Sequence, residues 1–312
     1  MSTQPVQPKD TDGHRDRPSC TVAVAAGKGG TGKTLLATSL AVTAAALGRA
    51  VQLLDCDVEE PNAHLLLRPQ IGEREEVTIL FPLVDHEACT GCGRCAEECQ
   101  FSAIAAMRGT IVTFPDLCAG CGVCAFVCPV GAISEVAKPI GVVDHGATVE
   151  GIDFWQGRTN IGVQRSSPLI RAVKKHIAED RLAIIDCPPG TACPMQESVA
   201  GASFCVLVTE PTPFGLSDLA AAVETCRTLG VPCGVILNRA GLNGSDAIIH
   251  GYCQSEGLPL LLQIPEERCI AEAYSRGETL AHALPEWREQ LAQVIEAIGE
   301  YVSNRSGDRA RS

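Results

Sequence analysis

Eight cysteines with a repeated spacing are the residues of this chain most suited to chemistry. Two copies of the pattern CxxCxxCxxxC occupy residues 89–99 and 118–128, with 18 residues between them. The chain has 17 cysteines in all, and many of the others lie in apolar segments such as VPCGVIL and ASFCVLV. In a reducing compartment this distribution favours metal ligation by the eight spaced thiols and simple burial of most others, rather than a disulfide framework.

The spacing resembles that of the bacterial ferredoxins that hold two [4Fe–4S] clusters. In that family the fourth cysteine of each copy ligates the other cluster. Carried over, the resemblance implies one ligand set of Cys89, Cys92, Cys95 and Cys128, and a second set of Cys118, Cys121, Cys124 and Cys99. Gln100 follows Cys99 where the ferredoxin pattern has a proline, but the proline ligates nothing. The alternative is a pair of structural zinc sites, which usually use CxxC pairs set farther apart and often a histidine.

A second motif, about 60 residues upstream, predicts a nucleotide site. Residues 27–34 read GKGGTGKT and fit the phosphate-binding pattern GxxxxGK[ST]. The glycines let backbone N–H groups approach a phosphate chain, and the helix that follows adds its positive end. The binding residues are then Gly27, Lys28, Gly29, Gly30, Thr31, Gly32, Lys33 and Thr34, with Lys33 neutralising phosphate charge and Thr34 ligating Mg²⁺. The alternative is a glycine-rich turn between a strand and a helix that binds no ligand.

The early lysine of this motif carries a more specific resemblance. KGGTGK, with a strand before it and LLDCD after it, resembles the deviant-Walker ATPases, which include MinD, ParA, the Mrp-type carriers and nitrogenase iron protein. In that family the early lysine reaches the nucleotide of a partner subunit, so Lys28 implies a homodimer that forms on ATP binding. With the cysteine segment included, the chain resembles MinD-superfamily ATPases that contain an inserted ferredoxin domain.

The same resemblance assigns further residues to the ATP site. Asp57 would orient the attacking water, so Lys28, Lys33 and Asp57 are the residues expected to act in hydrolysis. Asp55 would support Mg²⁺, and Asp186, at the start of the segment DCPPG, would hold Mg²⁺ through water. Asn238, in VILNRA, resembles the asparagine that reads the adenine edge. The alternatives are that these acids cap helices or loops and that Asn238 belongs to a plain turn.

The fold that must position these residues is predicted to be α/β. Strand-like apolar runs at residues 21–26, 50–55, 182–187, 204–209, 233–238 and 260–264 alternate with helical patterns near 33–47, 168–179, 217–229, 245–256 and 285–302. This alternation predicts a parallel sheet with helices on both faces and ligands at the carboxyl ends of the strands. Residues 82–138 break the alternation and are expected to form an inserted, metal-stabilised α+β ferredoxin-like domain. The P-loop ATPase domain then comprises residues 20–81 and 139–304, between a disordered tail at 1–19 and a flexible tail at 305–312.

Composition narrows the partners and the compartment. The 312 residues are 46% hydrophobic and 20% charged, as in ordinary globular proteins. The formal charge of −12, with no cluster of Lys and Arg, argues against nucleic acid. No run of 18 apolar residues occurs, the first 19 residues do not resemble a signal peptide, and the polar face of the helix expected at 285–302 is acidic. We therefore expect a cytoplasmic protein that binds no membrane.

Three functions fit these patterns. The first is an ATPase whose nucleotide-dependent dimer switch is coupled to electron transfer through two [4Fe–4S] clusters, to or from a partner protein. The second is an iron–sulfur assembly or delivery ATPase, although residues 187–269 lack the CxxC that Mrp-type carriers use. The third is a positioning or scaffolding ATPase with a structural ferredoxin module. Cys193 stands seven residues after Asp186, a spacing similar to that of a cluster ligand in nitrogenase iron protein, but the second ligand has no counterpart here.

Overall fold

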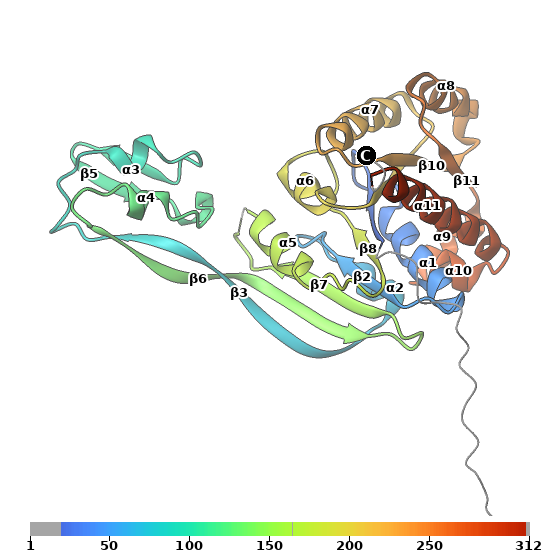
Figure 1. Cartoon of the computed structure of the whole chain (residues 1–312), viewed down its shortest axis with the longest axis horizontal. Coiled ribbons are helices and arrows are strands. Elements are labelled where there is room, and N and C mark those ends of the chain that lie inside the picture. Colours follow the sequence, from blue (N-terminus) through green and yellow to red (C-terminus); the bar gives the residue numbers. More distant parts are fainter. Residues whose placement is uncertain (1–19, 164, 310–312) are drawn as a thin grey trace, which may run out of the picture.

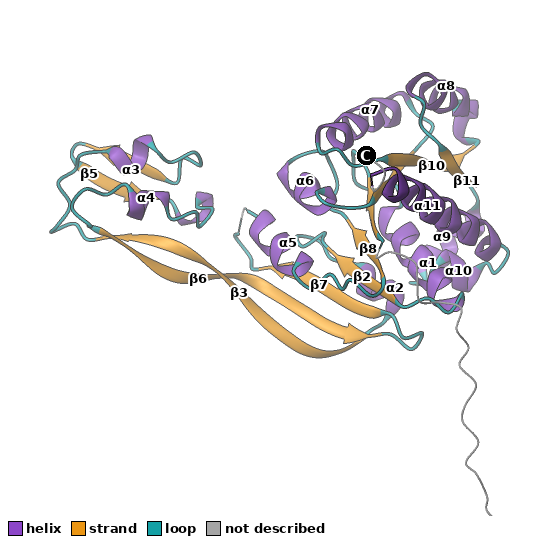
Figure 2. Cartoon of the chain, in the orientation of Figure 1, coloured by secondary structure: helices purple, strands orange, loops and turns teal. Residues whose placement is uncertain are grey.

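The protein is built on one large twisted sheet. The computed structural model describes residues 20–163 and 165–309, so the predicted tail at residues 1–19 lies outside the described residues. Within them the sheet has nine strands in the order β11-β10-β9-β1-β8-β2-β7-β6-β3 (Figures 1 and 2). Its parallel part consists of β1 (Thr21–Ala25), β2 (Val51–Asp55), β7 (Asp153–Thr159), β8 (Leu182–Asp186), β9 (Phe204–Thr209), β10 (Cys233–Ala240) and β11 (Leu260–Pro265). The α/β class and the mostly parallel sheet are confirmed.

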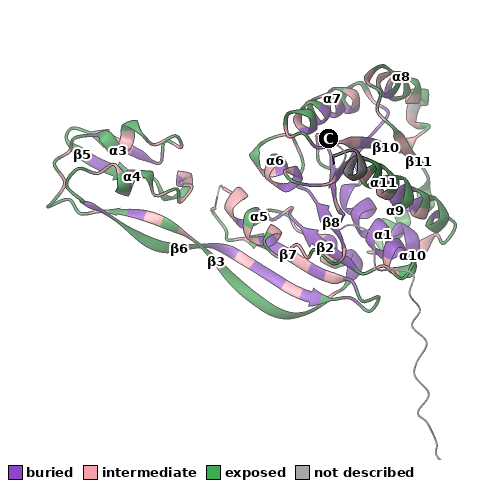
Figure 3. Ribbon diagram, in the orientation of Figure 1, coloured by how far each residue is buried: buried purple, intermediate pink, exposed green. Residues whose placement is uncertain are grey.

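Helices cover both faces of this sheet. Successive residues of a strand point to opposite faces, and both faces of the central strands are apolar and must be buried. In β1, Val22 and Val24 join one hydrophobic core, whereas Ala23 and Ala25 join the other. The central strands β2 and β8 are likewise buried (Figure 3). The first core is closed by α1 (Lys33–Ala46), α2 (Ala63–Leu67), α9 (Arg268–Ser275), α10 (Leu280–Ala283) and α11 (Trp287–Arg309). The second is closed by α5 (Ser167–Lys174), α6 (Cys193–Val199), α7 (Pro213–Thr228) and α8 (Asp246–Glu256). The carboxyl ends of the strands thus stay free for a ligand site.

One edge of the sheet departs from the parallel prediction. Two 15-residue strands, β3 (Gln70–Val84) and β6 (Ile133–Ala147), pair antiparallel with each other, and β6 pairs antiparallel with β7. We call β3 and β6 the ribbon; its near half completes the sheet and its far half extends away from it (Figure 2). The predicted boundaries at residues 82 and 138 therefore fall within two continuous strands. We call residues 20–69 and 148–309 the main body.

Residues 85–132, here called the cysteine unit, lie at the far end of the ribbon (Figure 1). The unit contains α3 (Arg94–Glu97), β4 (Ile104–Met107), β5 (Thr110–Thr113), the 3₁₀ turn η1 (Pro115–Leu117) and α4 (Val123–Phe126). Among the described residues, its buried hydrophobic cluster consists of Cys95, Ile104 and Ile111 together with Ile133 at the start of β6, and seven partly buried residues pack around it. So small a core supports the expectation that bound metal stabilises this unit.

The C-terminal helix packs on the main body. In α11 the side chains of Leu291, Val294, Ile295 and Ile298 are buried in the first core, as predicted for a helix docked on its own domain. The helix continues to Arg309, past the expected end of the domain at residue 304, and residues 310–312 lie outside the described residues. Among the helices of the described chain, none has both the length and the apolar character needed to cross a bilayer.

Candidate functional site

The glycine-rich motif forms the turn between β1 and α1. The backbone at Gly30 (φ 77°) and Gly32 (φ 94°) is in the left-handed region, which residues other than glycine rarely adopt. Gly27 packs so closely against the backbone of Asp218 in α7 that a Cβ there would collide with it. The motif ends at the first turn of α1, where Lys33 and Thr34 are both buried. These features fit the predicted phosphate loop.

Asn238 supports this loop from the end of β10. Its Nδ2 donates to the backbone oxygen of Thr31 at 2.8 Å, and its Oδ1 accepts from the backbone N–H of Arg239 at 3.0 Å. The Asn238 amide also lies where a Cβ on Gly32 would have to go. The structure thus gives Asn238 a role in shaping the phosphate loop, and its contact with adenine stays a prediction.

Two acids lie beside Lys33 at the strand ends. Burial raises the pKa of Asp57 to about 6, against a lowering effect of Lys33. Burial also raises the pKa of Asp186 to about 7, and nearby Thr34 and Lys33 lower it. Lys33 and Thr34 therefore face the acids that the sequence assigned to the same site.

Asp55 has a different environment from the other two. Its Oδ1 accepts from the backbone N–H of Asp57 at 3.1 Å, and its Oδ2 accepts from those of Asn62 and Ala63 at 3.1 and 3.0 Å. Burial, followed by the charge of Asp186, raises the pKa of Asp55 well above its usual range. These hydrogen bonds fix the loop from Cys56 to Asn62, which leads into α2. Both oxygens of the Asp55 carboxylate therefore already accept hydrogen bonds from the backbone. The predicted support of Mg²⁺ by Asp55 would be indirect in this arrangement.

The donor set at Asp186 fits a bound cation. Both of its carboxyl oxygens are buried, and among the described residues neither has a partner at hydrogen-bond distance, although the Thr34 hydroxyl lies near enough to lower the pKa. A buried carboxylate without partners is costly unless a cation or a proton compensates it. The Thr34 hydroxyl on the facing helix is an oxygen ligand of the kind that Mg²⁺ prefers. Asp186 and Thr34 are therefore the residues that would hold Mg²⁺.

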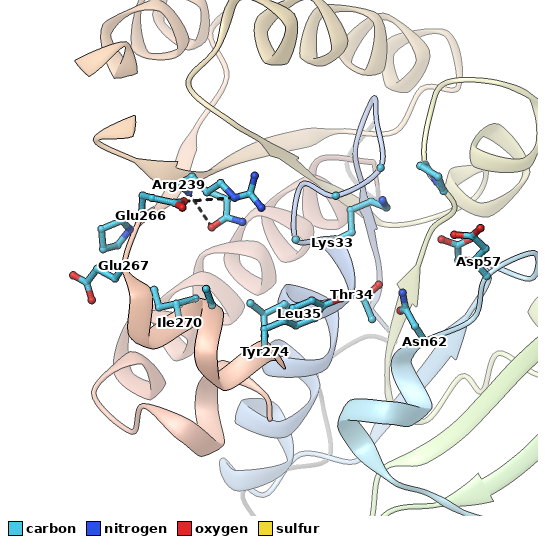
Figure 4. Close-up of a pocket in the computed structure, with 18 residues that line it drawn as sticks. Lys33, Thr34, Leu35, Asp57, Asn62, Arg239, Glu266, Glu267, Ile270 and Tyr274 are labelled. Atoms are coloured by element: carbon cyan, nitrogen blue, oxygen red, sulfur yellow. Dashed lines mark hydrogen bonds and ion pairs between the residues drawn. The ribbon is translucent and has the colours of Figure 1, made fainter. Parts of the chain in front are cut away.

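A cavity of about 290 Å³ opens over the phosphate loop. Lys33 lies between two groups of residues, with Asp57 and Asn62 on one side and Arg239, Ile270 and Tyr274 on the other (Figure 4). The other residues that line the cavity are Gly29, Gly30, Gly32, Thr34, Leu35, Glu60, Pro189, Asn238, Pro265, Glu266, Glu267 and Ala271. The size suits a nucleotide-sized ligand. Sequence reasoning missed the α9 side of this cavity, because Ile270 and Tyr274 belong to no motif.

Lys28 is held within its own chain. Its Nζ lies 3.0 Å from Oε2 of the buried Glu210, and Nη1 of Arg239 lies 2.7 Å from Oε1 of the same carboxylate. The Lys28 side chain keeps 35% of its surface exposed. In this single chain the lysine therefore points to a carboxylate of its own subunit, and its reach to a partner subunit stays a prediction.

The cysteine unit brings together thiols from both copies of its motif. A small cavity is lined by all four members of the predicted second set, Cys99, Cys118, Cys121 and Cys124. In the first set, burial raises the pKa of Cys95, and the neighbouring Cys92 and Cys128 raise it further. Cys99 thus lies with three thiols of the second copy and Cys128 lies near two of the first, while the two ligand sets stay a prediction.

Backbone N–H groups also converge on these sulfurs in a repeated pattern. The N–H groups of Gly91 and Gly120 each donate to the sulfur two residues before, in Cys89 and Cys118, at 3.4 Å. In the same way, Ala103 and Ala132 donate to the sulfur four residues before, in Cys99 and Cys128, at 3.3 and 3.2 Å. Hydrogen bonds to the sulfurs are one means by which proteins tune iron–sulfur clusters. The repetition supports an internal duplication.

The described thiols form no metal-ion site in this structure. In the described residues, no group of three or more His, Cys, Asp or Glu side chains closes on one point as a metal ion requires. A cubane needs thiolates at its four iron corners, which lie farther apart than the ligands of one zinc ion. The zinc alternative and the two [4Fe–4S] clusters therefore both stay predictions.

The remaining cysteines differ in exposure. Cys56 and Cys187 are fully buried at the ends of β2 and β8, as expected for packing residues. Cys193 is exposed at the first residue of α6. The structure places Cys193 outside both predicted ligand sets.

Comparisons with known proteins agree with the fold and the loop. An uncharacterised protein of Methanocaldococcus jannaschii is 34% identical over 224 residues, which is 71% of this chain and 79% of that protein. An iron–sulfur cluster carrier protein of Aquifex aeolicus is 24% identical over 304 residues, covering 90% of this chain and 66% of the carrier. Among solved structures, the septum site-determining protein MinD of Pyrococcus horikoshii, complexed with Mg-ADP, superposes with a TM-score of 0.54 at 20% identity, covering 94% of this chain and all of that one. A family model described as the CobQ/CobB/MinD/ParA nucleotide binding domain matches residues 22–280, and the chain therefore belongs to this P-loop ATPase family.

Proposed function

We propose that the protein is an ATP-hydrolysing iron–sulfur protein, in which a nucleotide-dependent dimer switch acts on two [4Fe–4S] clusters in the cysteine unit. The observation that carries the iron–sulfur part is the cavity lined by Cys99, Cys118, Cys121 and Cys124, which come from both copies of the motif. The ATPase part is supported by the buried Lys33 and Thr34 facing Asp57 and Asp186.

Hydrolysis in this site would depend on positioning and charge. Lys33 would neutralise the β- and γ-phosphates from the first turn of α1, and Asp186 with Thr34 would hold Mg²⁺. Asp57, which lines the cavity, would orient the attacking water. Lys28 would leave Glu210 and reach the nucleotide of a second subunit, so that hydrolysis waits for the dimer.

In the first form of this proposal, the clusters would transfer electrons. When bound, [4Fe–4S] clusters take up and release single electrons. Eight cysteines in two crossed sets give every iron corner a protein ligand, so no corner is left open for a substrate. The backbone donors to Cys89, Cys99, Cys118 and Cys128 would hold the thiolates in place. A partner protein would then supply or accept the electrons.

Cluster assembly or delivery is the second candidate, and the comparisons favour it. Relatives named iron–sulfur cluster carrier proteins, from Aquifex aeolicus and Saccharolobus solfataricus, align over 90% and 82% of this chain at 24% and 25% identity. A carrier of this design would release its clusters from the cysteine unit to an acceptor. The two candidates therefore differ in whether the iron stays with the chain.

A transfer experiment separates them. The anaerobically reconstituted protein, expected to hold about eight iron atoms in two clusters, would be incubated with Mg·ATP and an apo-acceptor that requires a [4Fe–4S] cluster. Electron transfer predicts that the iron stays bound and that Mg·ATP changes the cluster potentials followed by EPR. Delivery predicts an activated acceptor and a depleted donor. If the iron stays bound and Mg·ATP does not change the cluster potentials, both electron transfer coupled to ATP and cluster delivery are refuted. A scaffolding ATPase with a structural cysteine unit would then remain.

A control variant tests which thiols hold the clusters. Cys95→Ser removes a buried member of the first set, and Cys193→Ser removes an exposed thiol outside both sets. We expect reconstituted Cys95→Ser to lose about half of its iron while Cys193→Ser keeps all of it. Equal iron contents in the two variants would contradict the assignment of the ligands.

A further inference from the structure

One arginine of the main body touches the cysteine unit. Arg165 lies in the loop between β7 and α5, and its guanidinium carbon lies 4.5 Å from the centre of the Phe101 ring. Phe101 belongs to the cysteine unit, two residues after Cys99. Although β3 and β6 are the only covalent connection between the two parts, this stacking gives a second point of contact that does not run through the ribbon.

The contact lies at the predicted second cluster. Phe101 lines the same cavity as Cys99, Cys118, Cys121 and Cys124. Among the residues that the structure describes, the Nε of Arg165 is buried without a hydrogen-bond partner. The guanidinium thus brings a positive charge to the Phe101 side of this cavity, which Glu135 also lines.

The loop that carries Arg165 is anchored on both sides. At its start, the backbone N–H and the hydroxyl of Thr159 both donate to the oxygen of Val58, at 2.9 and 3.2 Å. At its end, the buried Ser166 leads into α5, which packs into the second hydrophobic core through Leu169. Val58 directly follows Asp57 of the nucleotide cavity. The position of Arg165 is therefore set by the main body.

We propose that the positive charge of Arg165, held by the main body, raises the reduction potential of the cluster bound by Cys99, Cys118, Cys121 and Cys124. This inference rests on the proposed iron–sulfur function. Reduction adds one negative charge to a cluster that four thiolates already make negative. A fixed positive charge nearby favours the reduced state, and it acts more strongly in a partly buried site than in water. The other cluster, bounded by Cys95 and its neighbours, would keep a potential independent of Arg165.

The test is a redox titration of the full chain, monitored by EPR, in the wild type and three variants. Arg165→Gln removes the charge, and Arg165→Lys keeps the charge but loses the planar stacking surface. Arg158→Gln is the control, since Arg158 is half exposed and lies 3.6 Å from Asp144 on the ribbon. We expect Arg165→Gln to make reduction of one of the two clusters about tenfold less favourable, which is about 59 mV for a one-electron couple. Arg165→Lys should keep most of the wild-type potential, and Arg158→Gln all of it.

The outcomes distinguish this inference from the proposed function. Two clusters in the wild type, with both potentials unchanged or equally shifted in Arg165→Gln, would overturn the role of Arg165 and leave the proposed function standing. A wild type that binds no cluster would overturn both. Iron content measured on each variant shows that a shifted potential does not come from a lost cluster.

Discussion

Replacing Asp186 by asparagine should stabilise the main body in the absence of Mg²⁺ and nucleotide. The Asp186 carboxyl is fully buried, and within the described part of the chain both of its oxygens lack hydrogen-bond partners. Burial raises its pKa from 3.8 to about 7. Above pH 7 the folded protein must therefore keep a poorly compensated negative charge in its interior, which an amide would remove.

The size and sign of this effect follow from the shift in pKa. In the folded state the group binds its proton more tightly than in the unfolded state, so stability falls as the pH rises from about 4 to about 7. A shift of about three units corresponds to about 4 kcal/mol lost at pH 8. Asparagine leaves a buried amide with unpaired atoms, so we expect Asp186→Asn to recover about 2 kcal/mol. At pH 5 the penalty is smaller, because the folded carboxyl is still protonated, and the gain should be less than half as large.

Urea unfolding at pH 5 and pH 8, with Mg²⁺ chelated, measures this difference. The only two tryptophans, Trp155 and Trp287, lie in the main body, so their fluorescence follows its unfolding. Asp180→Asn is the control, because Asp180 is 72% exposed. Added Mg·ADP should stabilise the wild type more than Asp186→Asn, since the variant loses a Mg²⁺-holding carboxylate.

Two results would refute the reasoning. If Asp186→Asn is no more stable than the wild type at pH 8, the buried carboxylate is compensated in a way that the structure does not show. If the gain is the same at pH 5 and pH 8, it does not come from the ionisation of Asp186.

Three further predictions concern nucleotide binding and the dimer. Lys33→Ala should weaken ATP binding by at least about tenfold, measured by calorimetry, because a buried charge that faces the phosphates is lost; unchanged affinity would contradict the site. Glu210→Gln should let dimers form at an ATP concentration about two- to fivefold lower in analytical ultracentrifugation, because Lys28 no longer has its intrachain ion pair; a higher requirement would show that Glu210 supports the dimer. Tyr274→Ala should reduce ADP affinity about tenfold while Tyr301→Ala, in α11, leaves it unchanged; equal effects would exclude α9 from the nucleotide site.

The parts of the fold that were predicted have strong local patterns. The run TVAVAA followed by GKGGTGKT gives a buried strand, a glycine turn and a helix start, and the structure has β1 and α1 at that place. The buried strands β8, β9 and β10 are continuous apolar runs, which is typical of a parallel sheet covered on both faces. Such strands are visible from the sequence because every residue in them is buried.

The ribbon was missed because its sequence lacks that signal. In β3 the residues from Gln70 to Glu76 are all exposed, and the run GEREE is typical of a loop. This strand exists because β6 pairs with it, and β6 is 49 residues farther along the chain. Pairing over such a separation is not encoded in either strand alone. For the same reason the sequence placed the boundaries of the insert within the ribbon.

The candidate site was likewise predicted in its motif residues and missed in its tertiary contacts. Motif residues such as Lys33 and Asp186 were assigned to one site, and the structure brings them together. The hydrogen bonds of Asp55 to the loop before α2 and the ion pair of Lys28 with Glu210 depend on tertiary contacts, so spacing could not predict them. Arg165 is the clearest case, because its partner Phe101 lies in a different part of the chain with no motif in common.

The pairing at the far end of the ribbon makes the cysteine unit removable. Val84 and Ile133 are register partners, so the chain enters and leaves this unit at neighbouring positions. A short turn joining the two strands would close the ribbon as an ordinary β-hairpin, without rerouting any strand of the sheet. In gene architecture, a single deletion of the codons for residues 85–132 would therefore leave the order of every strand in the main sheet unchanged.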